Sequence, residues 1–350
     1  MNLQKQILNI YTKLNKIKNI EKKKLIFSIG NTVKIDSKDY YFTPVRIHED
    51  LIIFGIIVFK DKYAKICSKL LDGKVDYIMV DAEKKIRPQK NNVPANIERR
   101  VREAVKKTKL IIYKGNDLTV DSIDLFLTYY FNKNIRGLGG KKILIIGAGN
   151  IGSKLAQILL ERGSRVFINR RNHKKNLQIS KTINFLKPRN TFEKIYPVKD
   201  INKTCKNTDI LIGSTSGKPV INKEMMSAIK SNAIVIDAGK GTVNKEALII
   251  AKERNIKIFR TDVTAALLGL IYKSIAMQKI SNKNYDLKKY DEHTLITQGL
   301  LGVKGDIVVD DVHKPNSIYG ICNGKGDFFR ELNTNQKKIL KKVRLKFSLK

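Results

Sequence analysis

The stretch Lys142-Ile-Leu-Ile-Ile-Gly-Ala-Gly-Asn-Ile-Gly152 decides the fold of this chain. Its four consecutive apolar residues are typical of a short strand that is buried on both faces. The glycines suit a tight turn, a close approach of backbone to phosphate, and close packing of helix on strand. The following helix directs unpaired N–H groups toward an anion. The expected pyrophosphate contacts are Gly147, Gly149, Asn150, Ile151 and Gly152.

The sequence on the carboxyl side of these glycines completes a βαβ unit. Apolar residues recur at helical spacing from Ile151 to Leu159, and Gly163 stands where a helix commonly ends. Arg165 to Asn169 then has the composition of a second strand. A turn with a purely structural role is the alternative, but the full strand, loop and helix context favours a dinucleotide site.

The residues at the end of this second strand distinguish the two nicotinamide cofactors. An NAD-binding domain usually has Asp or Glu there, which holds the ribose 2′-hydroxyl. This chain has Asn169, Arg170 and Arg171. A guanidinium binds a 2′-phosphate with two donors and also stacks on adenine. The sequence therefore predicts NADP, against the alternative that both arginines merely reflect a chain rich in basic residues.

The chain is strongly basic. It has 350 residues, 42% of them hydrophobic, which is enough for two domains with cores. The net charge of +37, from 69 basic and 32 acidic residues, is spread along the chain together with many Asn and Ile. Such spreading favours a genome-wide compositional bias over a polyanionic partner. The tail from Lys337 to Lys350 has seven basic residues and no acidic one, as a basic helix or a solvated arm would.

The composition also indicates where in the cell the protein is located and whether it binds a metal. No run approaches the roughly 20 apolar residues of a membrane span, and the first residues lack a secretory signal, so a cytoplasmic protein is expected. The three cysteines are far apart, and we expect them to be reduced and structural. The four histidines are not paired at ligand spacing, and turn carboxylates explain the acidic cluster near Asp310 better than a metal does. We expect no metal site.

The order of elements predicts an α/β protein in three parts. Residues 1–125 form an α/β substrate and catalytic domain, 126–270 a Rossmann domain with a doubly wound parallel sheet, and 271–350 a C-terminal extension. A helix near 121–131 connects the first two parts. In the extension, the sequence predicts a hairpin from 306–309 and 317–321, and a long apolar helix from about 263 precedes it.

Residues 110–270 resemble the two-domain shikimate dehydrogenases and methylenetetrahydrofolate dehydrogenases. Asn169-Arg-Arg is similar to the Asn-Arg-Thr of NADP-using shikimate dehydrogenases. Asp209-Ile-Leu-Ile-Gly-Ser-Thr-Ser-Gly-Lys-Pro219 and Ile234-Val-Ile-Asp-Ala-Gly239 are similar to the folate dehydrogenase segments that flank the nicotinamide. This resemblance implies three further cofactor contacts: Ser214, Thr215 and Gly239.

The resemblance also implies a catalytic lysine and aspartate. Thr119-Val-Asp-Ser-Ile-Asp-Leu-Phe126 lies where shikimate dehydrogenases have Asn-Thr-Asp-Gly-x-Gly-Phe, which maps their aspartate onto Asp121. Their lysine corresponds to Lys84, and the adjacent Lys85 remains open. An ammonium could donate a proton to the substrate oxygen while a carboxylate orients it. A chance lysine after a strand and a helix N-cap at Asp121 are the alternatives.

The first domain departs from both families. It lacks the Ser-x-Ser-Pro pair that binds the shikimate carboxylate and the tyrosine and lysine pattern of the folate enzymes. The resemblance therefore implies an NADP-dependent dehydrogenase or reductase that acts on an unassigned small hydroxy or keto substrate. It implies no membrane or nucleic acid partner and allows a homodimer. The alternative is a noncatalytic NADP-sensing or nucleic-acid-binding Rossmann protein, which the charge favours.

Overall fold

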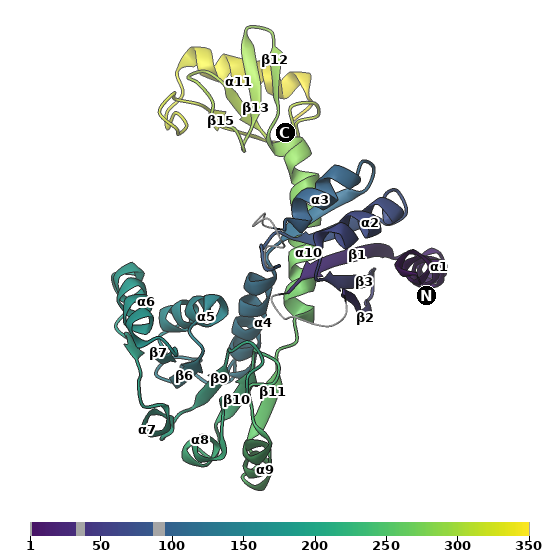
Figure 1. Ribbon diagram of the computed structural model, residues 1–350. Coiled ribbons are helices and arrows are strands. Elements are labelled where there is room, and N and C mark those ends of the chain that lie inside the picture. Colours follow the sequence, from purple (N-terminus) through teal and green to yellow (C-terminus); the bar gives the residue numbers. More distant parts are fainter. Residues whose placement is uncertain (1, 33–38, 87–94, 350) are drawn as a thin grey trace. The chain divides into compact units, whose positions relative to one another are not determined.

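The computed structural model describes residues 2–32, 39–86 and 95–349. The chain divides into two compact units, Met1–Leu268 and Gly269–Lys350. The first unit contains two separate sheets and the second contains one (Figure 1). The α/β class predicted from the sequence is confirmed.

The first sheet has five strands in the order β2-β3-β1-β4-β5. Its strands are β1 (Lys24–Asn31), β2 (Tyr40–Ile47), β3 (Leu51–Val58), β4 (Tyr77–Asp81) and β5 (Lys109–Tyr113). All neighbours pair in parallel except β2, an edge strand whose register shifts around Pro44, where a proline is tolerated. The carboxyl ends of β1, β4 and β5 therefore meet at one edge of this sheet.

Three helices pack against one face of the first sheet. They are α1 (Leu3–Glu21), α2 (Asp61–Leu71) and α3 (Ile97–Ala104). The core beneath them includes Phe27 and Phe54, whose rings lie 4.9 Å apart, together with the apolar stripe of α1. Burying aromatic and branched side chains of this size stabilises each by about 1.5–3 kcal/mol relative to exposure.

The connecting helix α4 (Gly115–Tyr130) begins earlier than the sequence predicts. Its N-cap, Lys114, makes no side-chain capping bond. Instead, the Gly115 amide donates to Asp81 Oδ1 at 3.1 Å and the Asn116 amide to Glu83 Oε2 at 2.8 Å. Because these capping groups come from the end of β4 and the loop after it, more than thirty residues upstream, no local sequence pattern marks the start of this helix.

The second sheet has six strands in the order β11-β10-β9-β6-β7-β8, and every pair is parallel. The strands are β6 (Lys142–Ile146), β7 (Arg165–Asn169), β8 (Ile195–Pro197), β9 (Ile210–Gly213), β10 (Ile234–Asp237) and β11 (Lys257–Arg260). This is the 3-2-1-4-5-6 order of the Rossmann fold, with its switch point between β6 and β9. The predicted Rossmann fold is confirmed.

Alternate residues of β6 define the two faces of the second sheet. Ile143 and Ile145 pack with α4, α5 (Asn150–Glu161) and α6 (His173–Leu186). Leu144 and Ile146 pack with α7 (Ile201–Cys205), α8 (Lys223–Ala228) and α9 (Lys245–Glu253). Helices on both faces explain why the strand sequence is continuously apolar.

The second unit is a four-stranded sheet with one helix packed on it. Its strands, in spatial order, are β12 (Leu287–Tyr290), β13 (His293–Thr297), β14 (Ile307–Val309) and β15 (Ile318–Ile321). The long helix α10 (Thr264–Asn284) crosses the boundary between the units. The antiparallel pairing of β14 with β15 gives the predicted hairpin, whereas the β12–β13 hairpin was not predicted.

The basic tail is helical. Helix α11 (Thr334–Lys346) begins with a capping box formed by Asn333 and Gln336, and Leu340 and Val343 pack on the sheet. Lys350 lies outside the described residues. In the ranges that the structure describes, no helix is both long enough and apolar enough to span a bilayer.

Candidate nucleotide-binding and catalytic site

The glycine elbow after β6 has the geometry that its sequence predicts. Gly147 has a φ of 107°, and its amide and that of Ala148 donate to the Asn169 carbonyl at 3.0 and 2.9 Å. A Cβ at Gly152 would lie 2.3 Å from the Gly147 carbonyl oxygen, so α5 packs here only with glycine. A Cβ at Gly149 would lie 4.0 Å from the nearest atom, which leaves an open approach to the backbone.

The loop after β9 is hydrogen-bonded to the elbow. The Ser214 amide donates to the Ile146 carbonyl at 2.8 Å, and Ser214 Oγ donates to the Gly147 carbonyl at 2.9 Å. Thr215 Oγ1 donates to the Lys218 carbonyl at 2.9 Å and so shapes the same loop. Both hydroxyls therefore maintain the switch point of the sheet, where a dinucleotide binds in this fold.

The loop after β10 closes around Asp237. Its carboxylate accepts the Gly241 amide at 2.7 Å, the Thr242 amide at 3.1 Å and the Thr242 hydroxyl at 2.7 Å. Burial raises the pKa of Asp237, but these donors outweigh burial and hold it below its usual value. A Cβ at Gly239 would lie 1.8 Å from the Thr215 carbonyl oxygen, so Gly239 is required by loop packing.

The end of β7 supports the elbow and supplies the predicted cations. Asn169 Nδ2 donates to the Val198 carbonyl at 3.0 Å, while Arg170 Nη1 donates to the Ala148 carbonyl at 2.6 Å. Arg170 is half-buried and Arg171 is exposed. Arg170 thus has a structural partner in the elbow, whereas Arg171 presents its guanidinium to solvent beside it.

A cavity of about 860 Å³ joins these features. It is lined by predicted residues from the elbow, the end of β7 and the loop after β9: Gly147, Gly149, Asn169, Arg170, Arg171, Ser214 and Thr215. Asn172, Ile201 and Lys218 also line it and were not predicted. Lys218 lies in the quoted Ser-Thr-Ser-Gly-Lys-Pro segment. Its position in a loop that follows a strand was the sequence feature that could have predicted it as a cavity residue. Main-chain amides and arginines are groups that bind phosphate.

The structure separates the two candidate lysines that follow β4. Lys84 is exposed. Lys85 is 14% exposed, and its Nζ lies 2.7 Å from both Asp81 Oδ2 and Glu83 Oε2. A Cβ at Gly115 would lie 2.7 Å from Lys85 Nζ, so the start of α4 packs directly on this group. The structure therefore places a lysine between two carboxylates at the carboxyl edge of the first sheet.

Asp121 lies in the second turn of α4 and is exposed. It does not cap the helix, because the helix begins at Gly115. One turn earlier, Asp117 forms salt bridges with Lys114 and with Lys154 of α5. Burial raises the pKa of Asp117, but the two ammonium groups outweigh burial and lower it overall. The first turn of α4 thus contacts both the Lys85 group and the helix that follows the glycine elbow.

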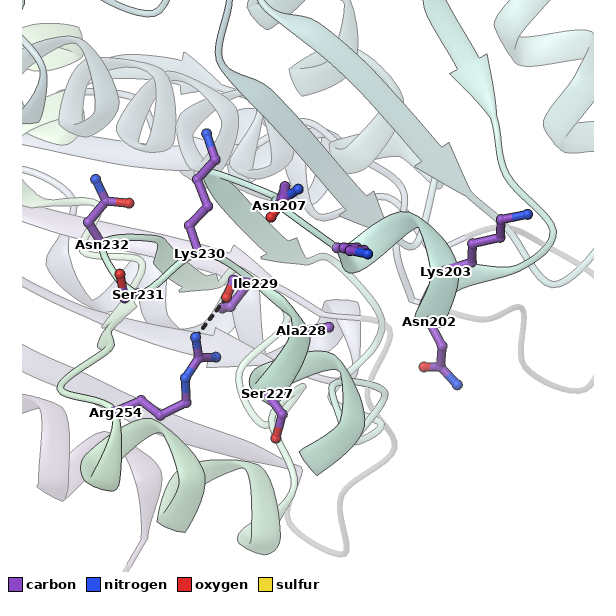
Figure 2. Close-up of a pocket in the computed structure, with 11 residues that line it drawn as sticks. Asn202, Lys203, Asn207, Ser227, Ala228, Ile229, Lys230, Ser231, Asn232 and Arg254 are labelled. Atoms are coloured by element: carbon purple, nitrogen blue, oxygen red, sulfur yellow. Dashed lines mark hydrogen bonds between the residues drawn. The ribbon is translucent and has the colours of Figure 1, made fainter.

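A second cavity, of about 930 Å³, lies at the opposite, amino-terminal end of the second sheet (Figure 2). Arg254 donates there to the Met226 and Ile229 carbonyls at the end of α8, and Lys230 Nζ donates to Asp209 at 2.7 Å. Carbonyls at a helix C-terminus carry partial negative charge. These cations already neutralise protein groups, so we assign this cavity no ligand.

The cysteines and acidic groups add no further chemistry to the site. Cys67, Cys205 and Cys322 are buried free thiols, and burial raises the pKa of both Cys67 and Cys205 to about 12. Within the described ranges, no group of three or more His, Cys, Asp or Glu side chains is arranged to hold a metal ion.

A glycine elbow at the switch point of a 3-2-1-4-5-6 parallel sheet defines a dinucleotide-binding protein of the Rossmann type. Residues 131–244 match the sequence model of the family described as shikimate / quinate 5-dehydrogenase, which confirms the resemblance inferred from the motifs. The match supports an oxidoreductase of the dehydrogenase type.

The chain is also similar to a glutamyl-tRNA reductase of Thermosipho melanesiensis, at 26% identity over 172 residues. The alignment covers 48% of this chain and 43% of that protein, so the chain spans less than half the length of this curated relative.

Solved structures with a similar fold include the dipicolinate synthase A chain from Bacillus subtilis. The match has a TM-score of 0.35 and 12% identity, covering 73% of this chain and 97% of that one. Another is the L-tryptophan dehydrogenase from Nostoc punctiforme, with a TM-score of 0.40, 15% identity and 63% of each chain covered.

Proposed function

We propose that this protein is an NADP-dependent dehydrogenase or reductase that acts in the cytoplasm on a small hydroxy or keto substrate. The observation that carries the proposal is the open Gly149 backbone beside Arg170 and Arg171, at the wall of one cavity. Among the residues that the structure describes, no carboxylate lines this wall to repel a 2′-phosphate. An arginine pair in that place favours NADP over NAD.

Different groups of this chain would bind different parts of NADP. The amides of the elbow and of the first turn of α5 would hold the pyrophosphate. Asn169, Arg170 and Arg171 would hold the adenosine ribose and its 2′-phosphate, and Ser214, Thr215 and Gly239 would form the floor beneath the nicotinamide. When bound, the nicotinamide supplies or accepts the hydride.

Lys85 is the proton donor that we favour. A half-buried ammonium between Asp81 and Glu83 is fixed in orientation and can donate a hydrogen bond to a substrate oxygen on which negative charge develops. The alternative assignment keeps Lys84 and Asp121, the pair that the family resemblance implies. Both assignments place the proton transfer at the carboxyl edge of the first sheet and the adjoining turns of α4.

A direct test is turnover. Purified protein is incubated with NADPH and a panel of keto acids, cyclic ketones and imines, or with NADP⁺ and the matching reduced compounds, and absorbance at the nicotinamide band is followed. We expect NADP-dependent turnover of at least one compound. Size-exclusion chromatography with light scattering on the same sample determines whether the protein is the homodimer that the sequence allows.

Helix α11 favours a second candidate, a noncatalytic nucleic-acid-binding protein. Its basic residues are all exposed, and the helix contains no acidic residue: Lys337, Lys338, Lys341, Lys342, Arg344 and Lys346. Such a face attracts phosphate backbones. Tight, salt-dependent binding of RNA or DNA, combined with no turnover in the panel, would favour this second function.

A further inference from the structure

We infer that the substrate is a multiply charged anion, a phosphate ester or a dicarboxylate, and that Lys240 and Lys218 select it. The inference rests on the proposed function. Both lysines are exposed, at the carboxyl edge of the second sheet. Lys218 lies in the loop after β9 and lines the nucleotide cavity, and Lys240 lies in the loop after β10. A third cation, Arg260, ends the neighbouring strand β11.

The tips of the two lysine-bearing loops are in contact. A Cβ at Gly241 would lie 3.5 Å from the Gly217 carbonyl oxygen. The loops are further joined where the Val220 and Ile221 amides donate to the Thr242 carbonyl at 2.8 and 2.9 Å. Lys218 follows Gly217 in the sequence, and Lys240 precedes Gly241. The two lysine side chains therefore extend from the place where the two loops meet.

The carboxylates of this edge accept hydrogen bonds from their own loops and form no salt bridge with the two lysines, although Asp237 also interacts electrostatically with Arg260. Asp237 directs both oxygens to the Gly241 amide and to Thr242. Asp262 accepts the Thr264 amide at 2.9 Å and the Thr264 hydroxyl at 2.6 Å. In the described part of the chain, none of Lys218, Lys240 and Arg260 forms a salt bridge. The edge therefore keeps a positive potential that suits a ligand with more than one negative charge.

The backbone of Lys240 adds an independent observation. Its φ is 57°, in the left-handed region that glycine and asparagine adopt most easily. The loop holds it there because Asp237 binds the next two amides. These bonds fix the backbone from which the Lys240 side chain extends.

The location of this junction makes the substrate the natural partner of the two lysines. In this fold each half of the sheet binds one mononucleotide of the dinucleotide. The elbow and the arginines belong to the half formed by β6, β7 and β8, so β9, β10 and β11 adjoin the nicotinamide. A substrate must meet the nicotinamide, and its anionic group would then face Lys218 and Lys240.

Isothermal titration calorimetry of protein saturated with NADP⁺ tests the inference. The probes are malonate, succinate and glycerol 3-phosphate, with dimethyl malonate, dimethyl succinate and glycerol as neutral counterparts. We expect saturable binding of at least one dianion and none of the neutral compounds. Lys240→Asn, which keeps the left-handed backbone, should weaken that binding at least tenfold, Lys240→Arg should restore it, and Lys218→Gln should weaken it similarly.

The matched control is Lys252→Asn, which removes an exposed lysine from the last turn of α9. It should change neither anion nor NADPH affinity. The inference is overturned if no dianion binds, if the neutral compounds bind equally well, if Lys240→Asn has no effect, or if Lys240→Asn weakens NADPH as much as the anion. Absence of NADPH binding in the parent protein would instead reject the proposed function, and the inference with it.

Discussion

Ser214 and Gly147 are 67 residues apart in the sequence, yet Ser214 Oγ donates a 2.9 Å hydrogen bond to the Gly147 carbonyl. This bond joins the loops that follow β6 and β9 at the point where the strand order reverses. A Cβ at Gly152 would also approach Ser214 Oγ, to 2.8 Å. The elbow, the start of α5 and the loop after β9 therefore form one rigid unit, which is preorganised to bind phosphate.

Two glycines of the elbow should respond differently to alanine. Gly149→Ala adds a methyl group on the open side, so the fold should keep its melting temperature while NADPH affinity falls at least tenfold. Gly152→Ala places its methyl group against the Gly147 carbonyl, so it should lower stability by about 1–3 kcal/mol as well. Thermal melts and fluorescence titration check both. Equal melting temperatures for the two variants would contradict this assignment of roles.

Alanine variants of the two arginines after β7 should also differ in their effects on cofactor affinity. Arg171→Ala removes an exposed guanidinium and should weaken NADPH about tenfold while leaving NADH affinity unchanged. Arg170→Ala also removes the hydrogen bond to the Ala148 carbonyl, so it should weaken both cofactors. Titrations of both variants with both cofactors measure the ratio of NADPH affinity to NADH affinity. A parent protein that binds the two cofactors equally well would show that the NADP assignment is wrong.

The lysine group after β4 gives a test of catalysis. Lys85→Gln should lower kcat by about 10²–10⁴ and leave NADPH affinity intact, as expected for loss of a general acid. Lys84→Gln is the matched control and should retain activity. If Lys84→Gln and Asp121→Asn abolish turnover while Lys85→Gln does not, the pair implied by the family resemblance is the catalytic one.

Lowering the pH should weaken the stabilisation that Asp237 gives to the loop after β10. The pKa of Asp237 is lower in the fold than in the unfolded chain, so its stabilising contribution is full above the unfolded value, near pH 4. That contribution is lost as the pH falls through the lowered value. Asp237→Asn should be less stable at pH 7, by about 1–3 kcal/mol, and should lose less stability than the parent between pH 5 and pH 3. Parallel melting curves across this range would contradict the role of the carboxylate.

The sequence predicted the Rossmann fold of the second sheet well because its determinants are local. A buried strand, three glycines and a helix follow one another within a few residues, and each glycine meets a steric demand of the backbone. The start of α4 was predicted too late because its capping groups, Asp81 and Glu83, are distant in sequence.

The lysines that follow β4 show the same limit. A lysine after a strand is common in so basic a chain, and Lys85 differs from Lys84 only through contacts of the folded chain, namely its two salt bridges and the packing of Gly115 on it. A role for Lys218 and Lys240 could likewise be inferred only from the fold, which brings their two loops together. Side chains whose role depends on such long-range contacts cannot be assigned from spacing alone.

The central claim is that a nicotinamide dinucleotide binds at the glycine elbow. Its most direct test is fluorescence titration of the purified protein with NADPH, in parallel with the Gly149→Ala variant. We expect one saturable site in the parent protein and at least a tenfold loss of affinity in the variant. No saturable binding, or identical binding by the two proteins, would contradict it.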